Sequence, residues 1–561
     1  MRAPILLRLA AAVATLCPPP VLAAQQPASP IAVSPATIPV TVTVANGPLV
    51  GRNANGVRVF KNIPYAAPPV GDRRWRAPQP VANWSAPRDA GEFGPICWQT
   101  DRLTKVYGGT LEPTSEDCLS LNIWTAADLG RAGDRPVRRP VMVWIHGGSF
   151  THGSGRSAIY DGTQFATAGI VLVTINYRLG GFGFFSHPAL SAESPTRTSG
   201  NQGLQDQAAA LRWVRDNITA FGGDPNNVTI FGESAGAFSV ADLLASPVAR
   251  GLFHKAILQS GSSLRQLPPL RGANDSARSA ERSGVAIARA SGVDAAAAAG
   301  DEGLRRLRAL PPDSLLALHA AQPGAPTDIV DGAFLTEPPG VTIARGRHAR
   351  VPILIGTNAD EATILVRPVP VTTAEQFEAL VRRLYGPQAE PLLALYPTAG
   401  TDGARRAYRQ LWTDDVFAAP ARETARAFAR SGQRVYRYYY TRVADGMAGL
   451  ALGAFHASEI PFVFGITQQA SPLWGKTSSD ATLALAMNGY WARFAATGDP
   501  NGAGAPVWPV YTERDDTHME FGATIAAGAG LRAKEFDVLS QVIAARVGVW
   551  EKGVTAAGGM R

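Results

Sequence analysis

Cysteine is scarce in this chain, which has 3 cysteines among its 561 residues. Cys17 stands in the N-terminal segment, and only Cys97 and Cys118 follow it. Two cysteines without a further cluster of cysteine or histidine argue against a structural zinc site. The sequence therefore predicts no structural metal.

Long apolar runs and dense basic runs are also lacking. The apolar run at residues 9–16 is too short to span a bilayer, so no stable membrane insertion is expected. The formal net charge is +8, but the densest basic stretch, residues 131–139, has no interleaved aromatic residues and is expected to be an exposed loop. No nucleic-acid partner is therefore expected. A hydrophobic content of 46% with 17% charged residues is instead typical of a globular protein with a large core.

The N-terminal residues have the layout of a secretory signal peptide. Arg2 and Arg8 precede the apolar run, and the small residues Ala23 and Ala24 follow it. We assign residues 1–24 to a signal peptide and residues 25–39, rich in proline, alanine and serine, to a flexible lead-in. Lipidation of Cys17 is the alternative, but Leu16 before it is a poor fit to the small residue expected there. The sequence predicts an exported protein, periplasmic or secreted.

Export bears on the two remaining cysteines. In an oxidising compartment, Cys97 and Cys118, roughly twenty residues apart, are expected to form a disulfide. Closing a loop of that size would stabilise the fold by about 3 kcal/mol on the chain-entropy argument.

Strands alternate with helices from residue 40 to about residue 555, which predicts one large α/β domain. No internal repeat and no linker divides it. The expected strands are residues 40–44, 57–62, 122–124, 141–145, 170–177, 228–231, 256–259, 352–356 and 435–441. The expected helices are residues 204–218, 237–244 and 488–496, with a helical region over 274–321.

The stretch Gly232-Glu233-Ser234-Ala235-Gly236 follows a strand and precedes a helix. That context is typical of a nucleophile elbow, in which the serine stands on a sharp, strained turn. Glycine is needed two positions either side because a side chain there would crowd the turn. The alternative is a Gly-Ser turn without chemistry. A second glycine-containing loop, His146-Gly147-Gly148-Ser149, ends the apolar strand 141–145, and it either supplies backbone N–H groups to a ligand or is an ordinary turn.

A serine nucleophile needs a base, and in folds with this elbow the order is serine, acid, histidine. The histidines after Ser234 are His319, His348, His456 and His518. The acidic pair Asp360-Glu361 follows the strand ending at Gly356, which leaves His456 and His518 as bases. His456 lies among small residues in a loop, whereas His518 follows a charged stretch that is expected to be an exposed turn. His456 is therefore favoured, while spacing leaves Asp360 and Glu361 open.

The sequence resembles the type B carboxylesterases, which include bacterial para-nitrobenzyl esterases, animal carboxylesterases and cholinesterases. The resemblance runs from about residue 40 to past residue 500, in the family's order. The matching motifs are SEDCLSLN (115–122), VWIHGG (143–148), NYR (176–178), GNQGLQDQ (200–207), FGGDP (221–225), FGESAG (231–236), LQSG (258–261), His456 with Glu459, and TGDP (497–500).

This resemblance implies an α/β-hydrolase fold, with a large, mostly parallel central sheet flanked by helices and with helical insertions. It implies Ser234 as nucleophile, Glu361 as acid and His456 as base. It further implies a Cys97–Cys118 disulfide and an oxyanion hole formed by the N–H groups of Gly148, Ser149 and Ala235. Ser149 departs from the family, which usually has a third glycine there; serine keeps the N–H, but its side chain narrows that edge.

The expected activity is hydrolysis of a small-molecule carboxylic ester through an acyl-enzyme, with no cofactor. Amide or lactone hydrolysis by the same groups, and a non-catalytic binding or adhesion protein on the same fold, are the alternatives. Glu233 has either an electrostatic or a structural role, and Ser260 either orients the triad or satisfies buried neighbours. The aromatic residues Trp98, Tyr107, Phe150 and Phe238 either line the substrate gorge or pack in the core. The sequence does not determine the physiological ester or the oligomeric state.

Overall fold

The computed structural model describes residues 37–106, 110–126, 131–132, 135–272, 279–293, 301–321, 327–443, 451–466 and 478–558. The expected signal peptide, Cys17 and the lead-in up to residue 36 lie outside the described residues, as does Tyr107. The chain from Thr37 onward clusters as one unit.

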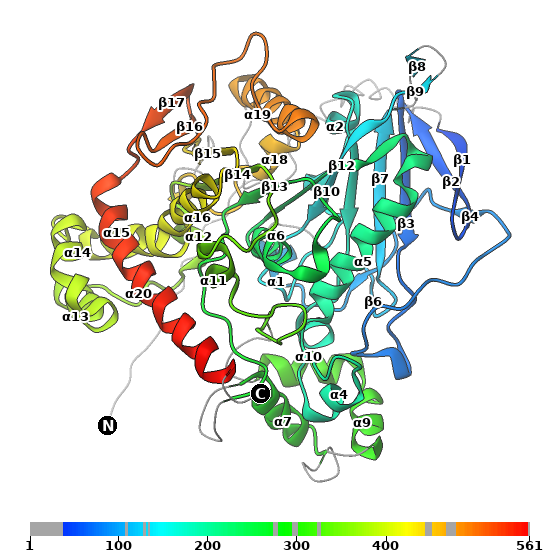
Figure 1. The fold of residues 1–561 in the computed structure, drawn as a ribbon, viewed down its shortest axis with the longest axis horizontal. Coiled ribbons are helices and arrows are strands. Elements are labelled where there is room, and N and C mark those ends of the chain that lie inside the picture. Colours follow the sequence, from blue (N-terminus) through cyan, green and yellow to red (C-terminus); the bar gives the residue numbers. More distant parts are fainter. Residues whose placement is uncertain are drawn as a thin grey trace, which may run out of the picture. The chain divides into compact units, whose positions relative to one another are not determined.

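Thirteen strands form one sheet in the order β1-β2-β3-β7-β11-β10-β12-β13-β14-β15-β16-β17, with β4 paired to β2 (Figure 1). The strands of this sheet are β1 (Ile38–Val44), β2 (Gly47–Ala54), β3 (Val57–Pro64), β4 (Arg88–Asp89), β7 (Ser120–Ala126), β10 (Arg139–Ile145), β11 (Val171–Ile175), β12 (Gly223–Glu233), β13 (Lys255–Gln259), β14 (Ile353–Asn358), β15 (Val435–Tyr440), β16 (Thr517–Phe521) and β17 (Ile525–Ala529). Two short pairs stand apart, β5 (Ile96–Cys97) with β6 (Thr114–Ser115), and β8 (Arg131–Ala132) with β9 (Arg135–Pro136).

The centre of the sheet, from β11 through β10, β12, β13, β14 and β15 to β16, is parallel. The middle strands β10, β11 and β12 are rich in buried apolar residues because both faces are covered. In β10 the side chains alternate: Val143 packs into one core cluster, and Met142 and Trp144 pack into the other. The outer strands pair antiparallel, from β1 to β11 on one edge and at β16–β17 on the other.

The helices are α1 (Arg102–Val106), α2 (Thr163–Thr167), α3 (Gly180–Gly183), α4 (Pro188–Glu193), α5 (Gln202–Asn217), α6 (Ala235–Ala245), α7 (Ala280–Ala290), α9 (Asp301–Arg308), α10 (Pro312–Ala320), α11 (Pro339–Ala344), α12 (Ala362–Leu365), α13 (Ala374–Tyr385), α14 (Ala389–Leu395), α15 (Gly403–Thr413), α16 (Ala419–Arg430), α18 (Ile460–Val463), α19 (Ser478–Thr497) and α20 (Ala533–Gly558). Short 3-10 turns are η1 (Gly71–Arg73), η2 (Ala158–Tyr160), η3 (Ile218–Phe221), η4 (Pro247–Ala249) and η5 (Gly386–Gln388), and η6 (Asp414–Ala418) is a π-helical turn.

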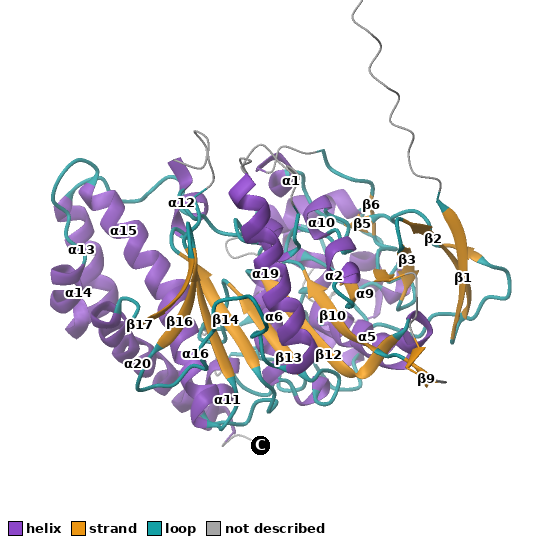
Figure 2. Cartoon of the chain, turned by 90° about the horizontal axis from the view of Figure 1, so that it is seen from above, coloured by secondary structure: helices purple, strands orange, loops and turns teal. Residues whose placement is uncertain are grey.

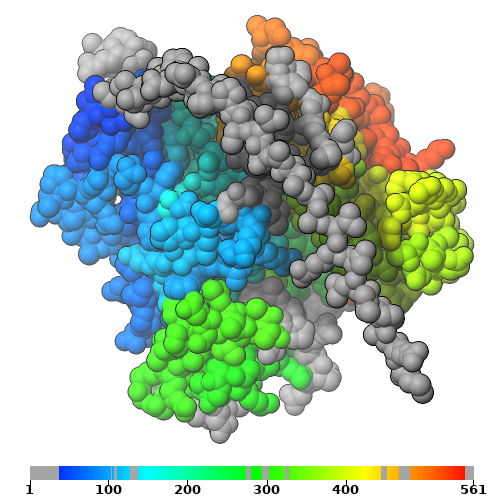
Figure 3. All heavy atoms as spheres, turned by 180° about the vertical axis from the view of Figure 1, so that it is seen from behind, coloured from blue at the N-terminus to red at the C-terminus, as the bar shows by residue number. Residues whose placement is uncertain are grey.

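Helices cover both faces of the sheet (Figure 2). Helices α5, α6 and α16 contribute to the core cluster that holds Val143, and α2, α18 and α19 contribute to the one that holds Trp144. Helices α7, α9 and α10 are inserted between β13 and β14. This insertion contacts the chain around residue 74, because the Arg74 guanidinium donates a hydrogen bond to the carbonyl oxygen of Arg308. Figure 3 shows the two segments side by side in green and blue.

The observed architecture is the expected α/β-hydrolase arrangement, but some local expectations differ from the structure. Residues 131–132 and 135–136 pair as the β8–β9 ladder rather than forming a plain loop. The strand before the elbow begins at Gly223 rather than at residue 228, because an irregular register lets β12 pair with β10 as far back as Arg139. His518 does not lie in an exposed turn: it is on β16 and is buried, since β17 pairs alongside it.

Candidate active site

Ser234 stands at the turn between β12 and α6. Its backbone has φ 55° and ψ −122°, a conformation that costs a non-glycine residue about 1–3 kcal/mol and persists only where the surroundings enforce it. The Ser234 N–H donates to the carbonyl oxygen of Gln259 at 2.9 Å, which ties the turn to the end of β13. The serine itself is only half-buried. The strand–turn–helix context expected from the sequence is present.

The two flanking glycines are required by close backbone contacts. A Cβ on Gly232 would lie 2.6 Å from the carbonyl oxygen of Ile145, and a Cβ on Gly236 would overlap that same oxygen. The end of β10 therefore packs directly against the elbow. No residue larger than glycine fits without moving backbone atoms.

The loop after β10 also lies against the elbow, since a Cβ on Gly147 would be 3.1 Å from Ser234 Cβ. Gly148 has φ +107° and Ser149 has φ 56°, so the loop turns sharply here. The N–H groups of Gly148, Ser149 and Ala235 donate no hydrogen bond to any residue in the described part of the chain. Three backbone donors in the two segments that meet at the serine thus remain available to a ligand.

His456 lies between two carboxylates. Its Nδ1 is 2.6 Å from Glu361 Oε2, and its Nε2 is 3.0 Å from Glu233 Oε1, on the residue adjacent to Ser234. The structure thus brings together the elbow after β12, the acid after β14 and the histidine of the loop before α18. Its resting arrangement has Nε2 on Glu233 rather than on the serine hydroxyl.

His456 and Glu233 shift each other's pKa. Burial lowers the pKa of His456, but the Glu233 and Glu361 carboxylates more than offset this, and the pKa is raised to about 9. Burial raises the pKa of Glu233 to about 8; the His456 ring opposes this shift, and the charges of Glu459 and Glu361 add to it. The protonation of His456 is therefore coupled to that of Glu233, and both pKa values lie above their ordinary range.

Sequence reasoning gave no role to the buried residues that support this cluster, although Gln259 and Glu459 stand in the matching motifs. Glu459 is fully buried and accepts hydrogen bonds from Gln259 Nε2 at 3.0 Å and Asn358 Nδ2 at 2.7 Å. The Asn358 N–H in turn donates to Glu361 Oε1 at 2.8 Å. The signal was present, because Gln259 and Asn358 are polar last residues that follow apolar runs in the parallel strands β13 and β14.

Asp360, the other member of the acidic pair, has a different place. Its Oδ2 accepts the Ala454 N–H at 2.9 Å, so it anchors the loop that carries His456 rather than the imidazole itself. The other histidines that follow Ser234 in the sequence lie in other clusters. His319, on α10, is beside Phe185, His348 is beside Phe428, and His518 is beside Tyr439. The structure thus distinguishes two acids that spacing could not.

Aromatic residues surround the histidine. The Phe417 ring, on the π-helical turn η6, lies 5.1 Å from the His456 ring, and Phe238 stacks on Phe417 at 6.4 Å. Of the residues considered for the gorge, Phe238 is half-buried beside this wall, whereas Phe150 is buried against Phe184. Trp98 packs on the cluster of helices α7, α9 and α10. Phe417 carried no sequence signal that pointed to the site.

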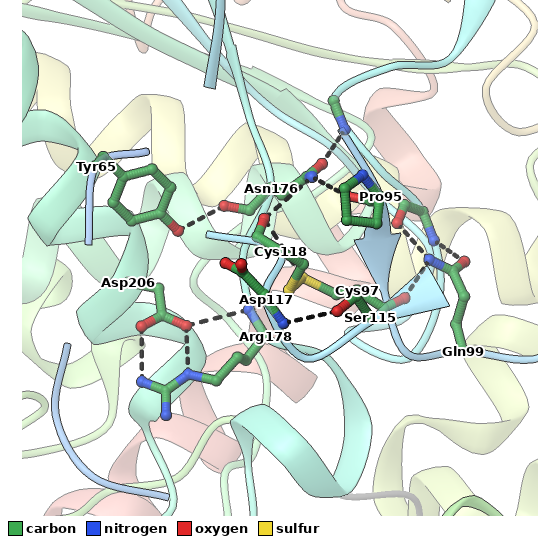
Figure 4. Close-up of a disulfide and its surroundings, with 12 residues drawn as sticks. Tyr65, Pro95, Cys97, Gln99, Ser115, Asp117, Cys118, Asn176, Arg178 and Asp206 are labelled. Carbon is green, nitrogen blue, oxygen red and sulfur yellow. Dashed lines mark hydrogen bonds and ion pairs between the residues drawn. A yellow bond between two sulfur atoms is a disulfide. The ribbon is translucent and has the colours of Figure 1, made fainter. Parts of the chain in front are cut away.

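The Cys97–Cys118 disulfide is present and buried (Figure 4). It lies next to Asn176, whose side-chain amide donates to the carbonyl oxygen of Cys118 at 3.2 Å. Arg178, two residues on, forms a buried ion pair with Asp206 at 2.7 Å. These contacts brace the loop after β11, so the NYR motif has a structural role here.

No group of three or more histidine, cysteine, aspartate or glutamate side chains in the described ranges is arranged to hold a metal ion. Of the helices that the structure describes, none is both long enough and apolar enough to cross a membrane.

Comparisons with known proteins agree with this geometry. The sequence model of the Carboxylesterase family matches residues 39–539. The chain is 36% identical to fumonisin B1 esterase of Sphingopyxis macrogoltabida, over 85% of this chain and 85% of that protein. It is 38% identical to para-nitrobenzyl esterase of Bacillus subtilis strain 168, over 82% and 89%. A solved PNB esterase structure superposes with a TM-score of 0.76 at 34% identity, covering 89% of this chain and 99% of that one.

These matches span most of the chain and are well above 30% identity. They bear out the resemblance drawn from the motifs, and the named relatives are esterases, which sets aside the non-catalytic alternative. The chain belongs to the carboxylesterase family and is a carboxylic ester hydrolase with the α/β-hydrolase fold.

Proposed function

We propose that Ser234, His456 and Glu361 form the catalytic triad that performs this hydrolysis. The observation that carries the assignment is the position of the His456 ring: Nδ1 is bound by Glu361 at 2.6 Å, while Nε2 faces the residue adjacent to Ser234. A ring held at one nitrogen by a buried carboxylate keeps its other nitrogen free to accept a proton.

In the first step, His456 Nε2 accepts the Ser234 hydroxyl proton as Oγ attacks the ester carbonyl carbon. The imidazolium, stabilised by Glu361, then gives this proton to the leaving alcohol, and an acyl-Ser234 remains. Water repeats the sequence with the same base and releases the carboxylic acid. The free N–H groups of Gly148, Ser149 and Ala235 stabilise the oxyanion of each tetrahedral intermediate, at about 3 kcal/mol per donor.

Glu233 has the electrostatic role in this scheme. The Glu233 carboxylate beside Nε2 favours the imidazolium and helps to raise the pKa of His456 to about 9. The protonated ring pairs with Glu233 at 3.0 Å and cannot act as a base, so the neutral imidazole is the active form. Turnover therefore requires Nε2 to exchange its contact with Glu233 for one with the serine hydroxyl.

The substrate is a small-molecule ester, and the names of the relatives suggest which esters to test. One is a fumonisin B1 esterase and another a para-nitrobenzyl esterase. A panel of para-nitrobenzyl esters, fumonisin B1, and simple esters graded by acyl length and alcohol size, with matched amides and lactones, would establish the preference. We also propose that the protein is exported, on the basis of Arg2, the apolar run and the small residues at 23–24.

Replacement of Ser234 by alanine tests the triad. Activity on a para-nitrophenyl ester should fall by roughly 10⁴-fold or more, and covalent labelling by a fluorophosphonate, read as a mass increase, should disappear. The matched control is Ser157→Ala, because Ser157 is exposed and its hydroxyl caps no helix. Retention of most activity by the Ser234 variant, with the fold intact, would refute the assignment.

A further inference from the structure

A large cavity lies outside the catalytic cluster. Its volume is about 640 Å³, within the range that binds small organic ligands. It is lined by residues 202, 205 and 212 of α5, the C-terminal part of α4, η4 and the segments at residues 75–79, 194–198 and 333–334. Helices α4 and α5 are labelled in Figure 1. None of the residues Ser234, Glu361, His456, Glu233 or Glu459 lines it. We call it the α5 cavity.

The α5 cavity contains an unpaired cation. Arg212, on α5, is half-buried, and its guanidinium makes no ion pair or hydrogen bond with any residue in the described ranges. Burial and the neighbouring Arg215 both lower the pKa of Arg212, and no carboxylate opposes them. A partly desolvated guanidinium without an acceptor is unfavourable unless a ligand or water supplies one.

The one acidic side chain in the cavity wall cannot serve Arg212, because it is already engaged. Glu193 Oε1 is 2.6 Å from Arg76 Nε, and its Oε2 is 2.8 Å from Arg308 NH1. The wall therefore carries an excess of positive charge. An anion entering the cavity meets attraction with no uncompensated carboxylate to repel it.

A second polar group on the same helix faces the cavity without a partner. Gln205, two turns before Arg212 along α5, has a buried side-chain oxygen that makes no hydrogen bond in the described part of the chain. Rotation of its amide would present the NH₂ group to an anion held by Arg212. Buried polar atoms in native proteins are nearly always satisfied, so an unsatisfied one that lines the same cavity as an unpaired cation indicates a ligand-binding surface.

The rest of the wall mixes polar and apolar residues. Among the apolar ones, Trp75, Leu190 and Phe334 are buried side chains that border the cavity, and the exposed Val248 also lines it. A purely inorganic anion would leave these surfaces wetted, whereas an apolar chain would cover them. The lining thus combines an unpaired guanidinium with buried apolar side chains.

We propose that the α5 cavity binds a small amphipathic carboxylate, whose carboxylate group pairs with Arg212 and Gln205 and whose apolar chain lies on Trp75, Leu190 and Phe334. Ester hydrolysis releases acids of this class, so the enzyme's own product has the required chemistry. The site is separate from the triad and does not depend on the residue roles proposed for it.

The test uses the full-length protein with its catalytic serine blocked by a fluorophosphonate, so that the active site cannot bind the acid. Octanoate titrated by calorimetry should show one saturable site, and 1-octanol, which lacks the charge, should bind at least tenfold more weakly. Arg212→Gln should weaken octanoate binding at least tenfold, and Arg212→Lys should restore part of it. The matched control is Arg215→Gln, one turn further along α5, because Arg215 is exposed and paired with Asp216 at 2.8 Å.

Three outcomes would overturn the proposal. One is the absence of saturable octanoate binding to the blocked enzyme, and another is equal loss of binding in the Arg212 and Arg215 variants. The third is binding of inorganic phosphate as tight as that of octanoate, which would show a plain anion site. Thermal unfolding of each variant establishes that it is folded, and the octanoate–octanol difference on the unmutated protein tests the charge requirement without any substitution.

Discussion

The two halves of the active site are built in different ways. The nucleophile half is made of backbone: Ser234 sits in five consecutive residues, pressed against the carbonyl oxygen of Ile145 and hydrogen-bonded to that of Gln259. The base half is made of side chains: Glu361 and His456 are 95 residues apart and meet through a buried network that includes Asn358 and Glu459. The nucleophile half requires that positions 232 and 236 carry no side chain, whereas the base half requires specific carboxylate and amide side chains.

This difference decides how each half responds to substitution. A glycine in the elbow cannot be enlarged without moving main chain, so an error there displaces the nucleophile itself. A carboxylate in the base half can be replaced by its amide at nearly the same volume, so an error there changes protonation and hydrogen bonding while the backbone stays in place. The four predictions below separate these behaviours.

The largest of these four effects is expected from Glu361→Gln in the base half. The amide no longer stabilises the imidazolium and can hold the ring in the wrong tautomer, so kcat/KM should fall by about 10³- to 10⁴-fold with little change in Tm. Ester hydrolysis with a chromogenic substrate measures the loss. The neighbouring Asp360→Asn is the matched control, because Asp360 contacts the Ala454 N–H and not the imidazole. An Asp360 variant as inactive as the Glu361 variant would contradict the assignment of the acid.

Gly236→Ala tests the backbone half. The added Cβ overlaps the carbonyl oxygen of Ile145, so the elbow must shift, and a displacement of about 1 Å costs roughly 10²-fold in rate. Unlike Glu361→Gln, this variant should also lose stability, by about 1–3 kcal/mol. Denaturant unfolding and kcat/KM are measured together. Gly251→Ala is the control, since a Cβ there has no neighbour within 4 Å, although its φ of +78° carries a conformational cost of its own. Unchanged activity and stability in the Gly236 variant would refute the tight contact.

Glu233 is adjacent to Ser234 in sequence and contacts His456, and Glu233→Gln should change the pH dependence of activity. Removing this carboxylate removes a charge that favours the imidazolium, so the pKa of His456 falls from its raised value of about 9. Activity requires the neutral imidazole and is lost on acidification; the acidic limb of the kcat/KM profile should therefore move to lower pH by roughly one unit. The rate on the plateau should change by no more than about tenfold. A limb that stays in place, or moves to higher pH, would show that Glu233 does not face the titrating histidine.

The smallest effect on catalysis is expected from the double replacement Cys97→Ser with Cys118→Ser. The disulfide closes a loop with a sequence separation of 21 and touches no residue of the triad. Its loss should lower the free energy of unfolding by about 3 kcal/mol and leave kcat/KM of the folded enzyme nearly unchanged. Unfolding of the unmutated protein with and without reductant provides the matched comparison. A large fall in kcat/KM at full folding would show that the loop shapes the site directly.

The sequence anticipated those parts of the fold whose pattern is local. The central strands β10, β13, β14 and β15 are short apolar runs, and α5 carries its apolar positions at helical spacing. The edge pair β16–β17 and helices α13 to α16 and α20 were not anticipated. The strands β16 and β17 are short and mixed in polarity, but α13, α15 and α16 carry apolar residues at helical spacing, so for these helices the signal was present in the sequence. His518 shows the consequence: its charged upstream neighbours indicate exposure, yet β17 covers it.

For the active site, local sequence identified the serine elbow and narrowed the base, because a strained turn needs glycine at fixed positions and the family order restricts the histidine. Its motifs also identified the enzyme class. Spacing left Asp360 and Glu361 open and the family resemblance implied Glu361; the structure shows that Glu361 contacts the imidazole while Asp360 contacts the loop. Only the tertiary structure decided that Glu459 and Phe417 support His456 and that Arg212 faces a cavity without a partner. The physical reason is range: a turn is determined by neighbours along the chain, whereas the burial and charge around a titratable side chain are determined by neighbours in space.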